Sequence, residues 1–193
     1  MTFRILTVCT GNVCRSPMAE RLLRSGLAAR CGEQAAAVEV SSAGTGALVG
    51  EAMTDPTRDL VTRHGGDAAG HRARMLAEQM VAEADLVLPL TRAHRAAVVT
   101  LHPRAARRTF TLREAARLAG AVDPAALPEG PLEARLRALV PALAAKRGFV
   151  PVTDPADDDV VDPYRRGEEV YAAMAASLVP AVEALLDVAC GQR

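Results

Sequence analysis

The chain has no tryptophan, and aromatic side chains make up only 3% of its 193 residues. Its 23 basic and 23 acidic side chains cancel, so we expect neither nucleic acid nor an anionic membrane surface as a partner. The sequence shows no secretory signal pattern, and we read no apolar run as long enough to span a membrane. These features predict a cytoplasmic globular protein whose core is built mostly from alanine, leucine and valine.

Cysteine is scarce as well, with four in the chain: Cys9, Cys14, Cys31 and Cys190. Because no secretory signal is seen, we expect these thiols to be reduced, and two disulfides are the less favoured alternative. No second cysteine or histidine pair at ligand spacing accompanies Cys9 and Cys14, so the sequence predicts no metal site and no cofactor.

Short runs of β-forming residues alternate with helical patterns along the first 118 residues. The expected strands span residues 3–8, 38–42, 84–90 and 108–112, and the expected helices span 18–29, 55–64, 75–84, 91–101 and a short stretch ending at 118. This alternation predicts an α/β fold, a three-layer α/β/α arrangement around a four-stranded parallel sheet, in a single domain over residues 1–193. Such sheets bind ligands in the loops at the carboxyl ends of their strands.

The alternation stops in an insert at about residues 120–153. A loop rich in proline and glycine leads to a helical stripe of leucines from Leu132 to Leu143, which ends near Gly148. This insert could cover the mouth of an active site, pack on an edge of the sheet or bind a partner. Beyond it, Asp154, Asp157, Asp158 and Asp159 are predicted to form a solvated acidic loop, and an amphipathic helix closes the chain.

The stretch from Cys9 to Pro17 follows the first expected strand and precedes the first expected helix. Five residues between Cys9 and Arg15 can wrap so that their backbone N–H groups converge on a phosphate at the helix N-terminus. Arg15 would add two parallel hydrogen bonds, and the positive surroundings would keep Cys9 as a thiolate. The expected phosphate-binding residues are Thr10, Gly11, Asn12, Val13, Cys14 and Arg15.

Three details of this loop are predicted from residue type. Gly11 and Asn12 are expected to adopt left-handed backbone angles. Ser16 fits a helix N-cap, with Pro17 at the first helical position, and its hydroxyl could also donate to the Cys9 sulfur. A cysteine and an arginine at this spacing are weak evidence alone, and the alternative is that Cys9 and Cys14 are only small buried thiols at a strand end. A nucleotide-binding P-loop is disfavoured because its Gly-Lys-Ser/Thr ending is absent.

The full string V-C-T-G-N-V-C-R-S-P resembles the signature of the low-molecular-weight protein tyrosine phosphatases. Four further segments resemble motifs of that family in the same order: residues 41–45 (Ser-Ser-Ala-Gly-Thr), His71 to Arg74, residues 84–88 (Ala-Asp-Leu-Val-Leu), and residues 162–164 (Asp-Pro-Tyr). The resemblance covers about residues 1–115 and 157–190 and leaves the insert unmatched.

The resemblance implies a phosphatase that forms a cysteinyl-phosphate on Cys9, with Arg15 binding the phosphate and Asp162 as general acid and base. It also implies that Asn12, Ser42 and His71, with Ser16 nearby, hold the loop in shape. Without the resemblance, Asp162 could not be distinguished from the other carboxylates of its region.

The same resemblance places the substrate pocket at Thr10, Leu48 and Tyr164 and implies a phosphotyrosine protein as substrate. Thr10, Leu48 and Arg165 depart from residues common in the family. Arg165 and Arg166 would make the rim positive and favour acidic phosphopeptides. The Asp-Pro-Tyr-Arg segment resembles bacterial members that act on tyrosine kinases of polysaccharide export.

Three alternatives remain open. Thioredoxin-coupled arsenate reductases share this fold and loop, but Cys31 and Cys190 do not lie where their relay cysteines are expected. A non-catalytic phosphate-binding protein would dispense with Cys9, Arg15 or Asp162, and all three are present. Finally, Cys14 is either an inert packing thiol or a partner that forms a protective disulfide with Cys9 on oxidation.

Overall fold

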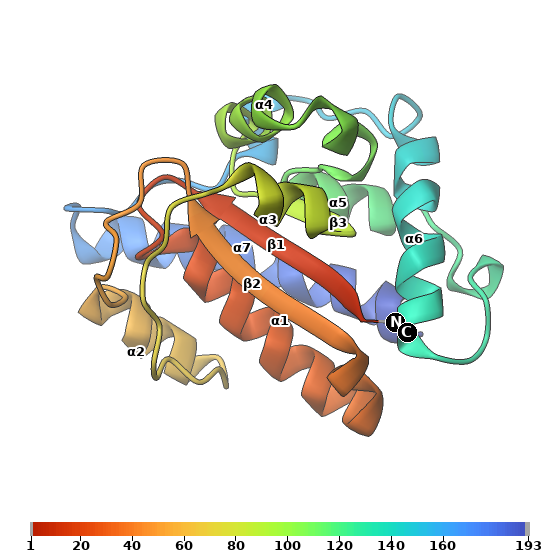
Figure 1. Cartoon of the computed structure of the whole chain (residues 1–193), viewed down its shortest axis with the longest axis horizontal. Coiled ribbons are helices and arrows are strands. Elements are labelled where there is room, and N and C mark those ends of the chain that lie inside the picture. The colour runs from red at the N-terminus through yellow and green to blue at the C-terminus, as the bar shows by residue number, and fades with distance from the viewer. Residues whose placement is uncertain (1, 192–193) are drawn as a thin grey trace.

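A computed structural model of the chain describes residues 2–191 and shows the three-layer α/β/α arrangement that the alternation predicts (Figure 1). The parallel sheet has the strand order β2-β1-β3, with bounds of Phe3–Cys9 for β1, Val38–Gly44 for β2 and Leu86–Pro89 for β3. Its helices are α1 (Arg15–Cys31), α2 (Asp55–Arg63), α3 (Glu78–Glu83), α4 (Arg92–Leu101), α5 (Leu112–Ala119), α6 (Leu132–Lys146) and α7 (Glu168–Cys190). Four 3-10 turns span Gly32–Ala37, Pro103–Arg108, Pro124–Ala126 and Pro155–Asp158.

Alternate residues of β1 face the two helical layers. Phe3 and Ile5 belong to the larger core cluster, which includes buried residues of α1, α5, α6 and α7. Leu6 and Val8 belong to a smaller cluster with residues of α3 and α4. A strand buried on both faces is typical of a parallel sheet, and it leaves the loop after Cys9 at the sheet's carboxyl edge.

The expected fourth strand at residues 108–112 is wrong, because the chain pairs with β3 there through a single bridge. Thr109 bridges to Val87, and the Phe110 N–H donates to the Val87 carbonyl at 3.1 Å. Thr111 then caps α5: its hydroxyl accepts from the Glu114 N–H, and the Glu114 carboxylate accepts from the Thr111 N–H. This capping box starts the helix before a strand can extend.

The expected helix at residues 75–84 is shorter than predicted. Residues 74–76 pair with the end of β2, where the Gly44 N–H donates to the Arg74 carbonyl and the Leu76 N–H donates to the Gly44 carbonyl. Because these backbone groups are engaged in sheet-like pairing, α3 begins only at Glu78.

Helix α6 of the insert packs at the end of the sheet opposite the Cys9 loop. Its core-facing leucines are fully buried, namely Leu132, Leu136, Leu139 and Leu143. Arg137 on the same helix pairs with Asp85 just before β3, at 2.7 Å, and donates to the Thr2 carbonyl just before β1. The insert therefore closes the amino end of the sheet and does not cover the loop at its carboxyl end.

Helix α7 is long and apolar enough to span a membrane by length and composition, contrary to the expectation that no such stretch exists. Half of its most apolar stretch is buried within the protein, and buried residues such as Met174, Leu178 and Val182 belong to the larger core cluster. Core helices of globular proteins have this composition when they are covered by neighbouring elements.

A disulfide joins Cys31, the last residue of α1, to Cys190, the last residue of α7, with their Cα atoms 6.3 Å apart. The expectation that all four thiols are reduced is therefore wrong for this pair, while Cys9 and Cys14 are free. The pair could not be predicted from the sequence, because the two cysteines are 159 positions apart and only the helix packing brings them together.

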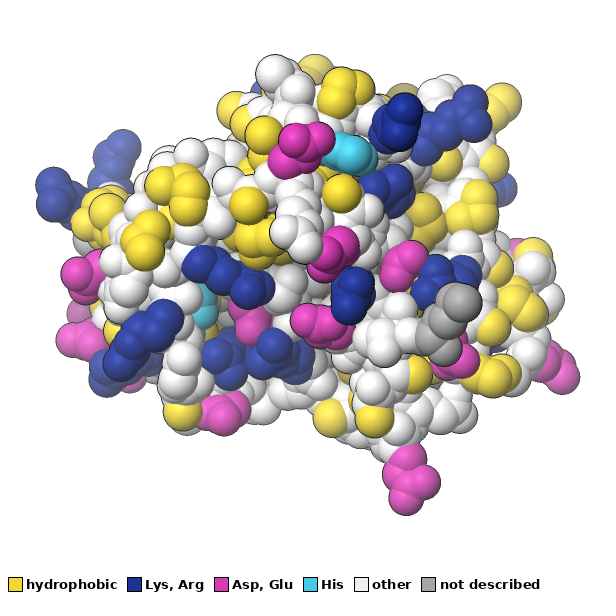
Figure 2. Space-filling view, viewed as in Figure 1, with side chains coloured by type: hydrophobic (Ala, Val, Ile, Leu, Met, Phe, Trp, Pro, Cys, Tyr) yellow, Lys and Arg dark blue, Asp and Glu magenta, His cyan; other side chains and the backbone are white. Residues whose placement is uncertain are grey.

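Acidic and basic side chains are interspersed on the face of the molecule seen in Figure 2, so no single sign of charge covers it. Many of them pair across elements, as Arg4 does with Glu39 of β2 and Glu83 of α3. Exposed pairs of this kind contribute little to stability, typically below about 1 kcal/mol each.

Candidate active site

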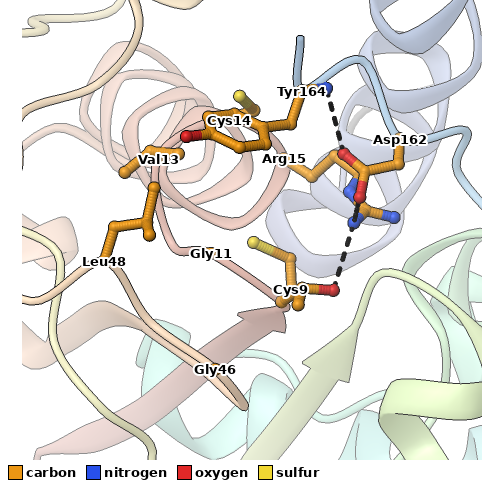
Figure 3. Close-up of a pocket in the computed structure, with 10 residues that line it drawn as sticks. Cys9, Gly11, Val13, Cys14, Arg15, Gly46, Leu48, Asp162 and Tyr164 are labelled. Carbon is orange, nitrogen blue, oxygen red and sulfur yellow. Dashed lines mark hydrogen bonds and ion pairs between the residues drawn. The ribbon is translucent and has the colours of Figure 1, made fainter.

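Cys9 lies at the carboxyl end of β1 and lines a cavity of about 130 Å³ together with the loop that follows it. Its thiol is buried, and its Sγ lies 3.0 Å from the Ser16 hydroxyl in the first turn of α1. Figure 3 shows the Cys9 sulfur directed into the cavity, with Leu48 on one side and Asp162 on the other. The loop thus presents a buried thiol next to the N-terminus of a helix.

Asn12 holds the loop in its curved shape. It is buried and adopts a left-handed backbone angle, with φ of 56°. Its side-chain amide donates to the hydroxyls of Ser16 and Ser42, at 2.9 Å each, and its side-chain oxygen accepts from the Arg74 N–H. Gly11 does not adopt a left-handed angle, so that part of the prediction is wrong, and the turn depends on Asn12 alone.

His71 and Arg74 support the loop from the segment that follows α2. His71 Nε2 donates to the Asn12 carbonyl at 2.7 Å, and burial lowers the pKa of the ring, so the neutral form is favoured. Arg74 donates to the Ser42 carbonyl at 2.7 Å. The structure therefore brings Asn12, Ser42 and His71 together as the resemblance implies.

Ser16 is not the N-cap of α1, contrary to the prediction, because the helix already begins at Arg15 and Cys14 occupies the cap position without a side-chain hydrogen bond. The Ser16 hydroxyl accepts from Asn12 and contacts the Cys9 sulfur. A side chain that interacts with the nucleophile and the supporting asparagine is not free to cap the helix.

Sequence reasoning missed Glu20, which is buried under the same network. Its carboxylate accepts from the Ser42 hydroxyl at 2.5 Å and pairs with Arg24 at 3.3 Å. Glu20 lies four residues after Ser16 and so on the same helix face, which is the signal that could have revealed it.

Arg15 and Asp162 meet across 147 residues of sequence. Arg15 Nη2 contacts the Asp162 carboxylate at 2.6 Å (Figure 3). Arg15 Nη1 donates to the Val160 carbonyl at 3.2 Å. The Arg15 side chain is 5% exposed, whereas that of Asp162 is 50% exposed at the rim. Arg15 Nε is buried and makes no hydrogen bond to any described residue, so it can donate to a phosphate oxygen.

His94 is a second residue that sequence reasoning missed. It lies on α4, where its Nε2 is 2.9 Å from the Thr10 hydroxyl and its Nδ1 is 2.9 Å from that of Thr91. Burial, with the positive charge of Arg15 as a further cause, lowers the pKa of His94 to about 4. The ring is therefore neutral at neutral pH and acts as a hydrogen-bonding support for Thr10. No regular spacing links Thr10 to His94, so only the fold reveals the contact.

Cys14 faces away from the nucleophile, toward α2 and α7. Its sulfur lies 3.5 Å from the Thr54 hydroxyl and 3.8 Å from that of Tyr171. Burial raises the pKa of Cys14, which keeps it as a thiol at neutral pH.

The structure places the remaining residues of the predicted pocket, Leu48 and Tyr164, at the mouth of the cavity. Val13, Leu48 and Tyr164 line the cavity with Thr10, and Leu48 and Tyr164 are each 37% exposed at its mouth. Arg165 follows with a left-handed backbone angle, and its guanidinium lies 5.2 Å from the Tyr164 ring centroid. Such a cation–π contact orients the ring that borders the cavity.

Residues 4–125 match the sequence model of the family described as low molecular weight phosphotyrosine protein phosphatase. The chain belongs to this family. The match covers the thiol loop and its supports but ends before the segment with Asp162, so the placement of that carboxylate rests on the geometry described above.

Known members of the family are similar in sequence and structure. The chain is 39% identical over 110 residues to a probable low molecular weight protein-tyrosine-phosphatase, EpsP, of Ralstonia nicotianae, covering 57% of this chain and 70% of that protein. It is also 39% identical over 114 residues to a protein-arginine-phosphatase of Geobacillus stearothermophilus, covering 59% and 72%. The solved structure of a low molecular weight protein tyrosine phosphatase from T. tengcongensis superimposes with a TM-score of 0.67 at 28% identity, covering 96% of this chain and 99% of that one.

Proposed function

We propose that this family member is a protein-tyrosine phosphatase that hydrolyses phosphotyrosine through a cysteinyl-phosphate on Cys9. The observation that carries the proposal is the convergence of Cys9, Arg15 and Asp162 on one cavity. A thiol, a guanidinium and a carboxylate in that arrangement supply a nucleophile, a phosphate-binding cation and a proton donor, which are the groups that monoester hydrolysis requires.

In the first step, the Cys9 thiolate attacks phosphorus in line with the ester oxygen, so an S–P bond forms as the O–P bond breaks. Loop amides and the Arg15 guanidinium stabilise the charge on the equatorial oxygens. Asp162 gives its proton to the departing phenolate oxygen. In the second step, Asp162 accepts a proton from water, whose oxygen attacks phosphorus and releases the thiolate and inorganic phosphate.

The walls of the cavity favour an aromatic leaving group. Val13, Leu48 and Tyr164 present apolar surface to the substrate side chain, and Tyr164 can stack against a phenyl ring. A guanidinium substrate would bring a positive charge to this apolar wall beside Arg15, where Asp162 is the one acidic side chain among the described residues that line the cavity. We therefore favour phosphotyrosine over phosphoarginine, although a protein-arginine-phosphatase is among the relatives.

The arsenate reductase alternative loses its basis in the structure. Cys31 and Cys190 are bonded to each other at the ends of α1 and α7, and neither lines the cavity that contains Cys9. The non-catalytic alternative does not explain why a carboxylate reaches the phosphate-binding arginine at 2.6 Å.

The natural substrate is proposed to be a phosphotyrosine protein, with a bacterial tyrosine kinase as a candidate. Arg165 and Arg166 follow Tyr164 on the exposed rim, so acidic residues next to the phosphotyrosine would find opposite charges there. Peptides with acidic or neutral flanks compared by KM would measure this preference.

The proposal is tested with Cys9→Ser and Asp162→Ala on a phosphotyrosine peptide and, in parallel, on a phosphoarginine peptide. We expect Cys9→Ser to abolish turnover and Asp162→Ala to reduce it by about 10²-fold or more, since a positioned acid contributes about 10²–10⁴. Wild-type turnover by Cys9→Ser would refute the mechanism, and faster turnover of phosphoarginine than of phosphotyrosine by the wild type would refute the substrate.

A further inference from the structure

The segment just before Asp162 is anchored to two helices, contrary to the prediction of a solvated acidic loop. Asp158 is buried and pairs with Arg117 of α5 at 2.9 Å, and the same arginine donates to the Val150 carbonyl of the insert. Asp154 and Asp157 are exposed, as predicted. Within one run of carboxylates, the structure thus separates solvated residues from anchoring ones.

Asp159 forms the second anchor, at the N-terminus of α4. Its Oδ1 accepts from the backbone N–H of Arg92, the first residue of that helix, at 2.7 Å, and its Oδ2 pairs with the Arg92 guanidinium at 3.2 Å. Its carbonyl accepts from Arg113 of α5 at 3.1 Å. A carboxylate at this position is favoured both by the unpaired N–H groups of the helix end and by the cation beside it.

Only two residues separate this anchor from the proposed acid. The first, Val160, is 1% exposed; its N–H donates to the Leu90 carbonyl at 2.8 Å, and its carbonyl accepts from Arg15. The second, Val161, is exposed and makes no such bond to a described residue. Since a residue spans at most about 3.6 Å of extended chain, the position of Asp159 restricts the reach of Asp162 to about 11 Å.

We propose that Asp159, through its pairing with Arg92, is a positioning residue that holds the acid loop so that Asp162 faces the leaving oxygen. This inference rests on the proposed function, because it assigns a role in the proton transfer of that reaction. Asp159 does not line the cavity, so its effect reaches the substrate only through the loop.

The proposal predicts which step is affected. The thiol loop is held by hydrogen bonds of Asn12, Ser42 and His71, and its Thr10 is supported by His94. None of these hydrogen bonds is made with Asp159, so phosphate binding and nucleophilic attack are preserved. Proton donation to the leaving oxygen requires Asp162 within hydrogen-bonding distance of that oxygen. Asp162 occupies this position for a smaller fraction of the time when the acid loop is free to move. The loss is therefore greatest for substrates whose leaving group is strongly basic and needs the proton.

The experiment compares Asp159→Asn with the wild type over a series of aryl phosphates from p-nitrophenyl phosphate to phenyl phosphate, with kcat/KM as the readout. Asn keeps the shape of the side chain and an oxygen for the Arg92 N–H but removes the charge that pairs with the guanidinium. We expect kcat/KM to fall about tenfold or more for phenyl phosphate and less than about threefold for p-nitrophenyl phosphate. The larger loss is smaller than the whole contribution of a positioned acid, about 10²–10⁴, because Asp162 itself is still present.

Asp157→Asn is the matched control, since this carboxylate lies in the same segment, is exposed and has no ion pair with a described residue. It should follow the wild type across the series, and Asp162→Ala should show the steepest dependence on the leaving group. Asp159→Glu should restore part of the loss by restoring the charge. Inhibition by inorganic phosphate should be equal in Asp159→Asn, Asp159→Glu and Asp157→Asn, which shows that each is folded at the thiol loop.

The inference would be overturned if kcat/KM of Asp159→Asn depends on the leaving group no more steeply than kcat/KM of the wild type. An equal loss for every substrate would also overturn it, because that pattern indicates a general structural defect. If the wild type itself fails to hydrolyse aryl phosphates, the proposed function is refuted. This outcome can be distinguished from the two above, because in those the wild type is active.

Discussion

Protonation of His94 is expected to destabilise the fold as the pH falls. In the folded protein this ring is 7% exposed, lies against Thr10 and Thr91, and has a pKa lowered from 6.5 to about 4 by burial. The unfolded chain exposes the ring to water, so it binds a proton below about 6.5. Stability is therefore fully present above this value and is lost as the pH falls toward 4, because the unfolded state binds more protons in that interval.

The magnitude follows from the two pKa values. A fall from 6.5 to about 4 corresponds to roughly 3 kcal/mol, which is lost in full only below pH 4, where the folded state is protonated as well. Between pH 7 and pH 5 the expected loss is about 2 kcal/mol, which would be a large share of the 5–15 kcal/mol typical of a globular domain. Burial lowers the pKa of His71 as well, which adds a loss of the same sign.

The assay is urea unfolding of the wild type and of His94→Asn at pH 7 and pH 5. Subtracting the two pH dependences removes the contributions of carboxylates and of His71, which are common to both proteins. We expect the wild type to lose about 2 kcal/mol more than the variant between the two pH values. Equal losses would refute the reasoning, as would an NMR titration in which the His94 ring of the folded protein gains its proton near pH 6.5.

Three further predictions concern the core and the cysteines. Leu139→Ala in α6 should lower the free energy of unfolding, measured with urea, by about 2–5 kcal/mol, because this leucine is fully buried. Its kcat/KM should be unchanged, because α6 lies far from the cavity; a loss of activity at full stability would contradict the placement of the insert. Reducing the Cys31–Cys190 disulfide, or replacing Cys31 with serine, should lower the thermal midpoint, since closing a loop of 159 residues is worth up to about 5 kcal/mol; equal midpoints with and without reductant would argue against it. Because the Cys14 sulfur is directed toward Thr54 and Tyr171, mild peroxide should oxidise Cys9 without joining it to Cys14, as followed by mass spectrometry; a Cys9–Cys14 disulfide would contradict this and support a protective role for the second thiol.

The predicted site residues that the structure brings together share a short sequence range or a recognisable motif. Cys9 and Arg15 lie in one loop whose spacing already indicates phosphate binding. Asp162 was selected from a group of carboxylates only by its resemblance to a family motif, and the structure places it against Arg15.

The parts that were missed depend on contacts between distant elements. Glu20 and His94 look like ordinary helix-surface residues until Ser42 and Thr10 are brought against them. The acidic character of Asp159 suggested exposure to solvent, yet its charge is balanced by an arginine 67 positions earlier. Composition indicates that a side chain is charged, but only the fold shows whether a partner meets it.

The errors in secondary structure have local causes that compete with periodicity. Thr111 and Glu114 form a capping box that ends the fourth strand at a single bridge. Met75 continues an apolar helical pattern, but the backbone around it is used by β2. In both places a hydrogen bond to a neighbouring element outweighs the weaker preference of the local sequence.

Helices α1 and α7 both start beside the cavity and both end at the Cys31–Cys190 disulfide. The first helix begins with the arginine of the thiol loop, and the second begins shortly after the acid loop. Helix α1 is about 25 Å long. If it tilts by about one degree about its disulfide-bonded end, its other end, at the thiol loop, moves by about 0.4 Å. Reacting groups must be aligned to within about 0.5 Å, so a change of about one degree at the disulfide-bonded end corresponds to most of that tolerance at the thiol loop.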